Sequence, residues 1–531
     1  MSNFGDHPAG FFGVSGFYNG VINQSLRLNV GSDYKLDRQM VTPTSVTGTI
    51  CTASWWMKKS AHGTVQSYIQ CRDNQASGEY CAYWSYGTDG SSISGTDSHS
   101  MRSGGAETIL VGTLTGGYPY RDPSGWYHVV IRFDSTQSTA ADRIRFYKNG
   151  QLQNSEFIGT TYPSQNAVET YWNNAGEHLI LFGNGEDSGD SFDGYIAEFN
   201  WVDGQSLAPE TFGESKNGVW IPKAITLSTA DYGLNGCRYT FSDSSDIGKD
   251  SSGVGNDLDR VSGLASTDVV PDSPENNFCT LNSLILTPQT TFSEGNLFAN
   301  IGATHKTVHG TFGITTGKWY WEARAFDGGA NKFTYGLTDT RNISNLQVSG
   351  TNYLLANTAA TYANGDAVSI YAGSLYKNGS ATGSYDTAVV DNDMVGIAFD
   401  ADAGKVWFHR EGTWINGSAT ASTTINLSNH DTTVTTGQTY HIAFAGETSD
   451  WLLNAGQDSS FAGTETAQGN TDSNGKGDFY YAVPSGFLAL CSANLPELTI
   501  GPNSDTQAGD YFNTVLYSGN SSSNAISGVG F

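Results

Sequence analysis

The chain has 531 residues, which is more than a single hydrophobic core usually supports and predicts two or more domains. Gly (64), Tyr (27) and Phe (26) are frequent and charged residues are few (15%), as in proteins built of short strands and tight turns. The formal net charge of −26 all but excludes a nucleic-acid-binding protein, because such proteins cluster Lys and Arg against phosphates, and it also disfavours an anionic membrane surface.

Residues 1–24 are rich in Gly and aromatic residues and predict an irregular N-terminal arm. The arm has no basic start and no long apolar run, so no secretory signal is expected. No stretch approaches the ~20 apolar residues of a membrane-spanning helix. The six cysteines show no C-x-x-C pattern and predict small buried thiols rather than a disulfide framework or a zinc site. The spacing of Cys71 and Cys81 lets them face each other across a hairpin.

Strand patterns recur over residues 25–215. In "RIRFYKNGQL", Ile144 and Phe146 point to one side and the residues between them to the other, the period of a half-buried strand. Further strands are expected at 25–38, 52–59, 80–87, 126–134, 178–185 and 192–204. A short helix is predicted over 206–215, with Ser206 as its N-cap.

The tetrapeptide Y-K-N-G occurs at 147–150 and again at 376–379. Asn-Gly supplies the two positive-φ positions of a type I′ hairpin turn. The residues around the two copies differ in composition and in the spacing of their aromatic side chains. The repeat therefore predicts two unlike sandwiches that share a turn, rather than a tandem duplication.

Residues 216–285 are rich in turn residues and poor in apolar ones, which predicts a connector. A second strand series follows over 286–496. It begins with "GKWYWEARAF", in which Trp319 and Trp321 share one face. Residues 497–531 predict a short C-terminal β segment. The predicted fold is all-β, with two different antiparallel sandwiches in tandem.

Motifs of the first series occur in the order "WYHVVIRFD", "YKNGQL", "FDGYIAEF", "SLAPETFGE". This order resembles the laminin-G / concanavalin A-like lectin superfamily over 25–215, which implies a jelly-roll sandwich. The second series, with "GKWYWEARAF", "VGIAFDADAGKVWFHREGTWING" and "LLNAGQDSSFAG", resembles a SPRY domain over 286–496.

Two further phrases, "DSPENNFCTLNSL" (272–284) and "PSGFLALCSANLPELTI" (484–500), are similar to phrases that recur in structural proteins of tailed phages, marine ones especially. This resemblance implies a virion protein. In such relatives, "AISGVGF" near the C-terminus looks like the opening strand of a further domain.

Glycosidases also use lectin-like sandwiches and need two carboxylates on one strand face, roughly 5–10 Å apart. The chain has no E-x-D-x-E run, and it has no G-x-S-x-G, H-E-x-x-H or P-loop motif. No catalytic residue and no required cofactor are therefore predicted.

The acidic loop "GEDSGDSFDG" offers Asp187, Asp190 and Asp193 as candidate calcium ligands, because calcium prefers several oxygen ligands from a flexible turn. Some laminin-G-like domains bind calcium. The other interpretation is a solvated loop in an acidic protein.

Aromatic side chains stack on sugar rings and dominate protein-binding hot spots. Trp84 and Tyr86 lie in a dense aromatic strand, and Trp414 and Trp451 adjoin loop residues, so these four are the candidate ligand-binding residues. Alternation would place at least half of the adjacent aromatic residues in the core instead.

Three functions remain open. The first is a tail-fibre or spike adhesin that contacts a host-surface glycan or protein through sandwich loops. The second is a capsid decoration or head-fibre protein without a dedicated ligand, and the third is a polysaccharide-degrading enzyme. The expected location is the virion. The expected partners are other virion proteins and further copies of the chain in a homotrimer, with no nucleic acid and no membrane insertion.

Overall fold

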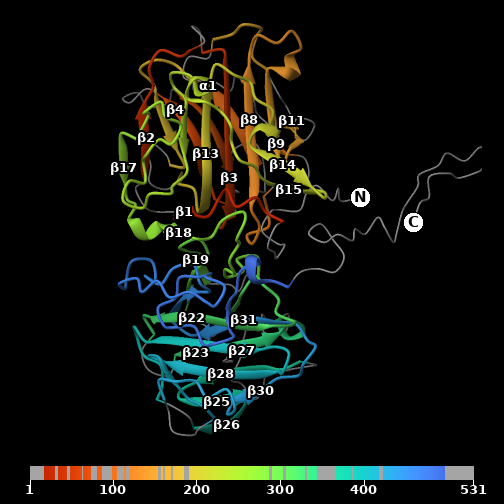
Figure 1. Ribbon diagram of the computed structural model, residues 1–531, viewed down its shortest axis with the longest axis vertical. Coiled ribbons are helices and arrows are strands. Elements are labelled where there is room, and N and C mark those ends of the chain that lie inside the picture. The colour runs from red at the N-terminus through yellow and green to blue at the C-terminus, as the bar shows by residue number, and fades with distance from the viewer. Residues whose placement is uncertain are drawn as a thin grey trace, which may run out of the picture.

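The computed structural model describes residues 17–29, 34–44, 48–62, 64–72, 80–86, 98–103, 113–114, 120–153, 157–158, 162–168, 172–183, 190–285, 290–302, 306–328, 332–343, 365–384, 387–417 and 422–496. Two β-sandwiches are stacked along the long axis of the molecule (Figure 1). The strands of the first run along that axis, and those of the second run across it. The all-β prediction of two antiparallel sandwiches is confirmed.

The first sandwich pairs an eight-stranded sheet with a six-stranded one. The larger sheet has the order β10 (Gln151–Leu152), β9 (Ile144–Lys148), β8 (Tyr127–Asp134), β3 (Ile50–Lys59), β13 (Gly194–Asp203), β1 (Ser25–Leu28), β18 (Val269–Val270), with β16 (Cys237–Tyr239) also on β13. The smaller has the order β17 (Arg260–Ser262), β2 (Lys35–Gln39), β12 (His178–Leu181), β4 (Gln66–Arg72), β5 (Tyr80–Tyr86), β6 (Ser98–Ser103). Two two-stranded sheets accompany them, β7 (Thr113–Leu114) with β11 (Phe157–Ile158), and the hairpin of β14 (Gly213–Lys216) with β15 (Val219–Pro222).

The second sandwich pairs a nine-stranded sheet with a six-stranded one. The larger has the order β19 (Thr290–Ser293), β20 (Phe298–Ile301), β32 (Ser449–Asn454), β22 (Lys318–Phe326), β27 (Met394–Asp400), β28 (Lys405–Arg410), β29 (Thr413–Trp414), with β30 (Thr432–Thr433) on β28 and β33 (Leu488–Ala489) on β22. The smaller has the order β21 (Lys306–His309), β31 (Tyr440–Gly446), β23 (Phe333–Asp339), β24 (Ala367–Tyr371), β25 (Ser374–Lys377), β26 (Ser380–Ser384).

Each sandwich has its main core between its two sheets. Ile144 and Phe146 face the first core, and Trp319 and Trp321 face the second, as the alternation of these strands predicts. The described cysteines Cys51, Cys71, Cys237, Cys279 and Cys491 are free and buried. Cys71 lies opposite Cys81 across the β4–β5 pair, as expected.

A second aromatic layer covers the outer face of each larger sheet. The first outer layer consists of Ile22, Trp56, Trp126, Tyr195, Ala197, Trp220 and Val270. The second outer layer consists of Phe278, Tyr320, Ala398, Trp407, Trp414, Phe479, Phe487, Ala489 and Cys491. The larger sheets are therefore buried on both faces. Adjacent residues such as Trp55 and Trp56 are both inaccessible, although alternation predicts only one of them in the core.

Most of the segment 216–285 is not a connector but part of the first sandwich, whereas Phe278, Cys279 and Leu281 near its end pack in the second sandwich. Its strands β16, β17 and β18 pair with β13, β2 and β1. Tyr232, Cys237 and Tyr239 are buried in its cores. The prediction failed because the few apolar residues of this segment complete sheet edges formed by strands far away in the sequence.

Both Y-K-N-G tetrapeptides form the predicted turn, with φ of 48° and 75° at Asn149 and Gly150 and of 50° and 74° at Asn378 and Gly379. The helix expected over 206–215 is smaller than predicted. It is one 3₁₀ turn, Pro209–Thr211, and the chain then enters β14 at Gly213. Other short helices are Ala140–Asp142, α1 (Thr229–Tyr232), Ser266–Asp268, Thr340–Asn342 and Ser492–Asn494. Within the described residues, no helix is long and apolar enough to cross a membrane.

Candidate functional site

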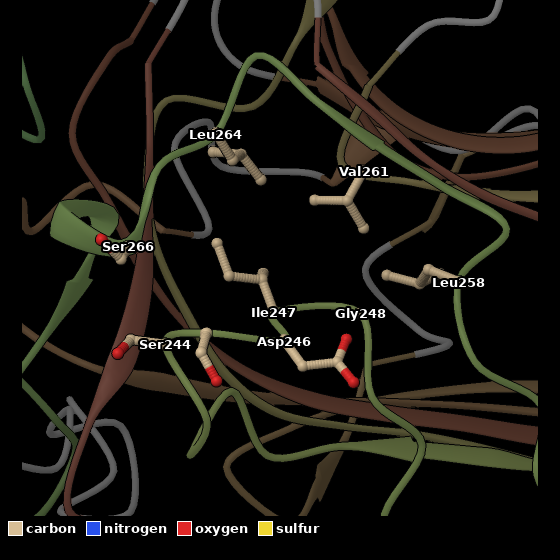
Figure 2. A pocket seen from close by; sticks show the side chains of 9 residues that line it. Ser244, Asp246, Ile247, Gly248, Leu258, Val261, Leu264 and Ser266 are labelled. Atoms are coloured by element: carbon tan, nitrogen blue, oxygen red, sulfur yellow. The ribbon is translucent and has the colours of Figure 1, made fainter.

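A hollow of about 510 Å³ opens at the β17 edge of the first sandwich. Four aliphatic side chains form its floor and surround one space in Figure 2, namely Ile247, Leu258, Val261 and Leu264. The rim carries Ser244, Asp246 and Ser266. We call this feature the edge hollow. Its described lining residues include one carboxylate, whereas glycoside hydrolysis by the usual route needs two.

The loop that frames the edge hollow is held by its own aspartates. Asp243 accepts a hydrogen bond from the backbone N–H of Ser245 at 3.0 Å, and Asp250 accepts one from that of Ser252 at 2.8 Å. The N–H of Leu258 donates to the carbonyl of Gly248 at 2.9 Å. These bonds explain why a sequence of turn residues forms an ordered wall.

A second hollow, of about 320 Å³, lies where the arm, the first sandwich and the loop at 475–477 meet. Its carboxylate, Glu275, accepts hydrogen bonds from the backbone N–H groups of Asn19, Gly20 and Ile22 at 3.0, 3.1 and 2.8 Å. Burial raises the pKa of Glu275, and these N–H groups oppose the shift. The carboxylate thus anchors residues 19–22 of the predicted arm to the sandwich.

The two sandwiches meet around a buried lysine. The Lys58 ammonium contacts Asp272 Oδ2 at 2.8 Å, Asn277 Oδ1 at 2.7 Å and the Phe278 carbonyl at 3.0 Å, and both ionic side chains are fully buried. Trp126 donates to the other oxygen of Asp272 at 3.0 Å. Burial raises the pKa of Asp272, while Lys58 opposes the shift.

An arginine makes a second charged contact across the junction. Arg27 of β1 is 1% exposed and lies 2.8 Å from Asp458, 3.2 Å from Asp268 and 3.5 Å from Glu294. Asp458 and Glu294 belong to the second sandwich. Breaking a buried ion pair of this kind leaves an uncompensated charge, so the junction resists separation of the sandwiches.

The segments 272–284 and 484–496 pair with each other at this junction. The N–H of Asn277 donates to Ser492 Oγ at 2.9 Å, and the N–H of Ser492 donates to the Asn277 carbonyl at 2.8 Å. Phe278 and Cys491 form an antiparallel bridge beside them. Residues 272–284 and 484–496, far apart in the sequence, therefore contribute to one contact.

A buried serine–histidine pair lies under the first outer layer. Ser54 Oγ is 2.9 Å from His128 Nε2, and Trp220 Nε1 donates to His128 Nδ1 at 2.9 Å. An indole N–H only donates, so the neutral imidazole carries its proton on Nε2 and Ser54 accepts it. Burial lowers the pKa of His128 to about 3. The pair is arranged to satisfy buried polar atoms, because a serine that accepts from the imidazole is not activated as a nucleophile.

The second outer layer buries a carboxylate. Glu322 is inaccessible and accepts hydrogen bonds from the N–H groups of Tyr480 and Tyr481 at 2.9 and 2.8 Å and from the Tyr320 hydroxyl at 2.9 Å. His409 Nε2 lies 2.8 Å from that hydroxyl. Burial raises the pKa of Glu322 to about 7, and the N–H donors oppose the shift.

Trp414 and Trp451 were expected at the surface, and this expectation is wrong. Trp451 is 0% exposed and packs in the main core of the second sandwich against Phe444, with ring centroids 5.0 Å apart. Trp414 is 5% exposed and lies 4.6 Å from the His409 ring. Loop residues next to a tryptophan do not expose it when another segment covers that face of the sheet.

The remaining predicted site residues are placed only in part. Trp84 and Tyr86 belong to β5, and their side chains lie outside the described part of the structure. Asp187 also lies outside the described residues, whereas Asp190 is half-buried and Asp193 is 3% exposed. Within the described residues, no group of three or more His, Cys, Asp or Glu side chains is arranged to hold a metal ion. The calcium site therefore stays a prediction.

Sequence reasoning missed the edge hollow because its residues lie in the segment predicted as a connector. The available signal was the spacing of Ile247, Leu258, Val261 and Leu264 among turn residues. Isolated apolar residues in a polar segment are common on protein surfaces, so this signal was weak.

Residues 35–210 match the family model Laminin_G_3, described as the concanavalin A-like lectin/glucanases superfamily. Over this span, the first sandwich is similar to concanavalin A-like domains. The match ends before the edge hollow, whose described lining residues fall between 244 and 266.

Solved structures similar to this chain include two SPRY domains. The SPRY domain of human HERC1 has 16% identity and a TM-score of 0.21, and the similarity covers 34% of this chain and 95% of that one. The PSpry domain of TRIM65 has 13% identity and a TM-score of 0.22, with 33% and 89% covered. A search of curated proteins found no match.

Proposed function

We propose that the chain is a virion protein of a tailed phage, of the tail-fibre or spike type, that contacts a host-surface glycan or protein through the loops of its sandwiches. The observation that carries this proposal is the pairing of the two phage-like phrases, through Asn277 and Ser492, at the junction of the sandwiches. The residues that resemble phage structural proteins are those that join the two domains into one body.

A rigid two-domain body suits an adhesin. The Lys58 and Arg27 contacts hold both sandwiches in one orientation, so loops of either domain are presented at fixed positions. Fixed loops bind with a smaller entropy cost than loops on a flexible pair of domains. In this proposal, weak sites act together through several copies of the chain, a homotrimer in the simplest case, attached to other virion proteins.

Attachment to host cells tests the proposal directly. The full chain, fluorescently labelled, is incubated with a panel of marine bacteria and with their isolated surface polysaccharides. Saturable attachment that unlabelled protein displaces supports the adhesin. Heat-denatured chain at the same concentration is the control for non-specific adhesion.

Three outcomes would overturn the adhesin assignment. The first is the absence of saturable attachment to the host on which the phage grows. The second is a cryo-electron microscopy map of the virion that places the chain on the capsid surface, which would identify a decoration or head-fibre protein. The third is release of reducing sugar from host polysaccharide by the full chain, which would identify a polysaccharide-degrading enzyme.

A further inference from the structure

The edge hollow lies outside the part of the chain that matches the concanavalin A-like family. All its described lining residues come from the segment 244–266, which follows the matched span 35–210. This segment reaches the smaller sheet through β17, whose Val261 lies opposite Leu36 of β2. The hollow is therefore a feature that the family resemblance does not account for.

The hollow is formed before any ligand arrives. Asp250 accepts hydrogen bonds from the N–H groups of Gly255 and Asn256 at 3.1 and 2.9 Å, and this ties the two ends of the loop together. A Cβ on Gly248 would lie 2.9 Å from Val261 Cγ2 and 3.0 Å from Leu258 Cβ, so the loop packs directly on the floor. A preformed site avoids the entropy cost of ordering its walls on binding.

The floor and the rim differ in chemistry. The floor is aliphatic, whereas the rim offers the hydroxyls of Ser244 and Ser266 and the carboxylate of Asp246. Asp246 is exposed, and no group in the described part of the chain donates a hydrogen bond to its carboxylate. The lining therefore combines an apolar floor with a charged acceptor that receives no hydrogen bond from the described residues (Figure 2).

A sugar that carries a methyl group matches this arrangement. Its methyl group, as in a 6-deoxyhexose or an N-acetylhexosamine, would be buried on the aliphatic floor, and each buried carbon favours binding. Its hydroxyls would donate to the carboxylate, in hydrogen bonds stronger than those between neutral groups. The same carboxylate repels an acidic sugar. A volume of about 510 Å³ falls within the range of small-molecule sites.

We propose that the edge hollow binds a neutral saccharide carrying a methyl group, with its C–H face on Ile247, Leu258, Val261 and Leu264 and its hydroxyls on Asp246. This inference rests on the proposed adhesin function and names its ligand class. A protein receptor is the competing occupant, and it is an outcome of the test.

Saturation-transfer NMR on the full chain tests the site with methyl rhamnoside, N-acetylglucosamine and glucuronic acid as probes. The first two are expected to bind with dissociation constants on the order of 1 mM, and glucuronic acid at least about tenfold more weakly. Asp246→Ala is expected to weaken binding about tenfold, because it removes a charge-assisted acceptor. Ser244→Trp is expected to abolish binding by filling the hollow.

Matched controls separate the site from general effects. Glu210→Ala removes an exposed carboxylate of the same sandwich, and Ser164→Trp adds an indole at an exposed serine away from the hollow, so both should bind as the native chain does. If the Asp246→Ala and Ser244→Trp variants bind the sugar probes as tightly as the native chain does, the inference is overturned. So would attachment of the full chain to host cells without binding of any probe, a result that leaves the adhesin function standing with a protein receptor. Failure to attach to host cells, by contrast, counts against the adhesin function itself.

Discussion

The first and second outer layers cover equivalent faces of the two larger sheets, but they enclose different polar groups. Under the first layer, the imidazole of His128 is held between Ser54 and Trp220, and all three groups are neutral. Under the second layer, the imidazole of His409 contacts Tyr320, which in turn donates to the carboxylate of Glu322.

This difference shows that two sheets with similar aromatic outer layers can bury different polar groups under those layers. Burial lowers the pKa of both His128 and His409 to about 3, so both imidazoles are neutral near pH 7. Beneath the second outer layer, burial raises the pKa of Glu322 to about 7, so this carboxyl changes charge near neutral pH. The polar groups beneath the second layer should therefore respond to pH near neutrality, where the neutral His128, Ser54 and Trp220 beneath the first layer do not. The following changes test this comparison.

The largest effect is expected at Lys58, where the first layer meets the second sandwich. Lys58→Ala leaves Asp272 buried beside an empty space, and the free energy of unfolding should fall by about 3–5 kcal/mol. Urea unfolding of the full chain, followed by tryptophan fluorescence, measures this loss. Lys223→Ala, at an exposed lysine, is the control and should change little. A loss below about 1 kcal/mol would mean that Lys58 does not hold the junction.

Glu322, which lies under the second outer layer, should make the free energy of unfolding depend on pH. Its pKa rises from an ordinary value near 4.5 to about 7 on folding, so between these values the folded chain binds more protons than the unfolded chain. Stability from this group is complete below pH 4.5 and is lost as the pH rises to about 7, by about 3 kcal/mol in total. The difference in unfolding free energy between native chain and Glu322→Gln should fall accordingly over this range.

The histidines do not disturb that measurement, because they titrate in both proteins and cancel in the difference. Their lowered pKa values alone would make stability rise with pH up to about 6.5. A pH-independent difference between native chain and Glu322→Gln would show that the carboxyl of Glu322 does not titrate in this range.

A substitution at Gly150 measures how tightly Trp220 of the first outer layer packs on the Asn149-Gly150 turn. A Cβ at this position would lie 2.5 Å from the ring of Trp220, and φ is +75°. Gly150→Ala should cost about 2–3 kcal/mol, from backbone strain and overpacking together. Gly218→Ala is the matched control, since its φ is +83° with nothing within 4 Å, and it should cost about 1 kcal/mol in a thermal unfolding experiment. Equal costs would show that Trp220 moves aside.

The smallest effects are expected at the two Asn-Gly turns, where similar losses of stability are predicted in the two sandwiches. Asn149 Oδ1 accepts the N–H of His128 at 2.9 Å, and Asn378 Oδ1 accepts the N–H of Ala367 at 2.8 Å. Asn149→Ala and Asn378→Ala should each cost about 1 kcal/mol, because each removes the hydrogen bond from that N–H and a residue that tolerates positive φ. Asn378→Ala also removes the hydrogen bond from Asn378 Nδ2 to Asp366 Oδ1 at 3.0 Å, which should add no more than about 1 kcal/mol. Native-state hydrogen exchange of the two N–H groups reports each turn separately. If the two losses in stability differ severalfold, the two Asn-Gly turns do not stabilise their hairpins in the same way.

The candidate site was predicted less well than the fold. Alternation correctly placed Ile144, Phe146, Trp319 and Trp321 in the cores, because period 2 is a local property of a strand. Trp414 was misplaced because exposure depends on whether a distant segment covers the face, which alternation does not report. The edge hollow escaped notice because its floor assembles from residues scattered between 247 and 264.

Local chemistry in the sequence determined the all-β class, the two Asn-Gly turns and the facing of the long strands, since each depends on neighbouring residues alone. The tertiary structure decided which segment completed the first sandwich, which aromatic residues stayed accessible and how Lys58 and Arg27 joined the domains. Those outcomes depend on contacts between residues hundreds of positions apart, and burial and ion pairing are set by the partners that folding brings together.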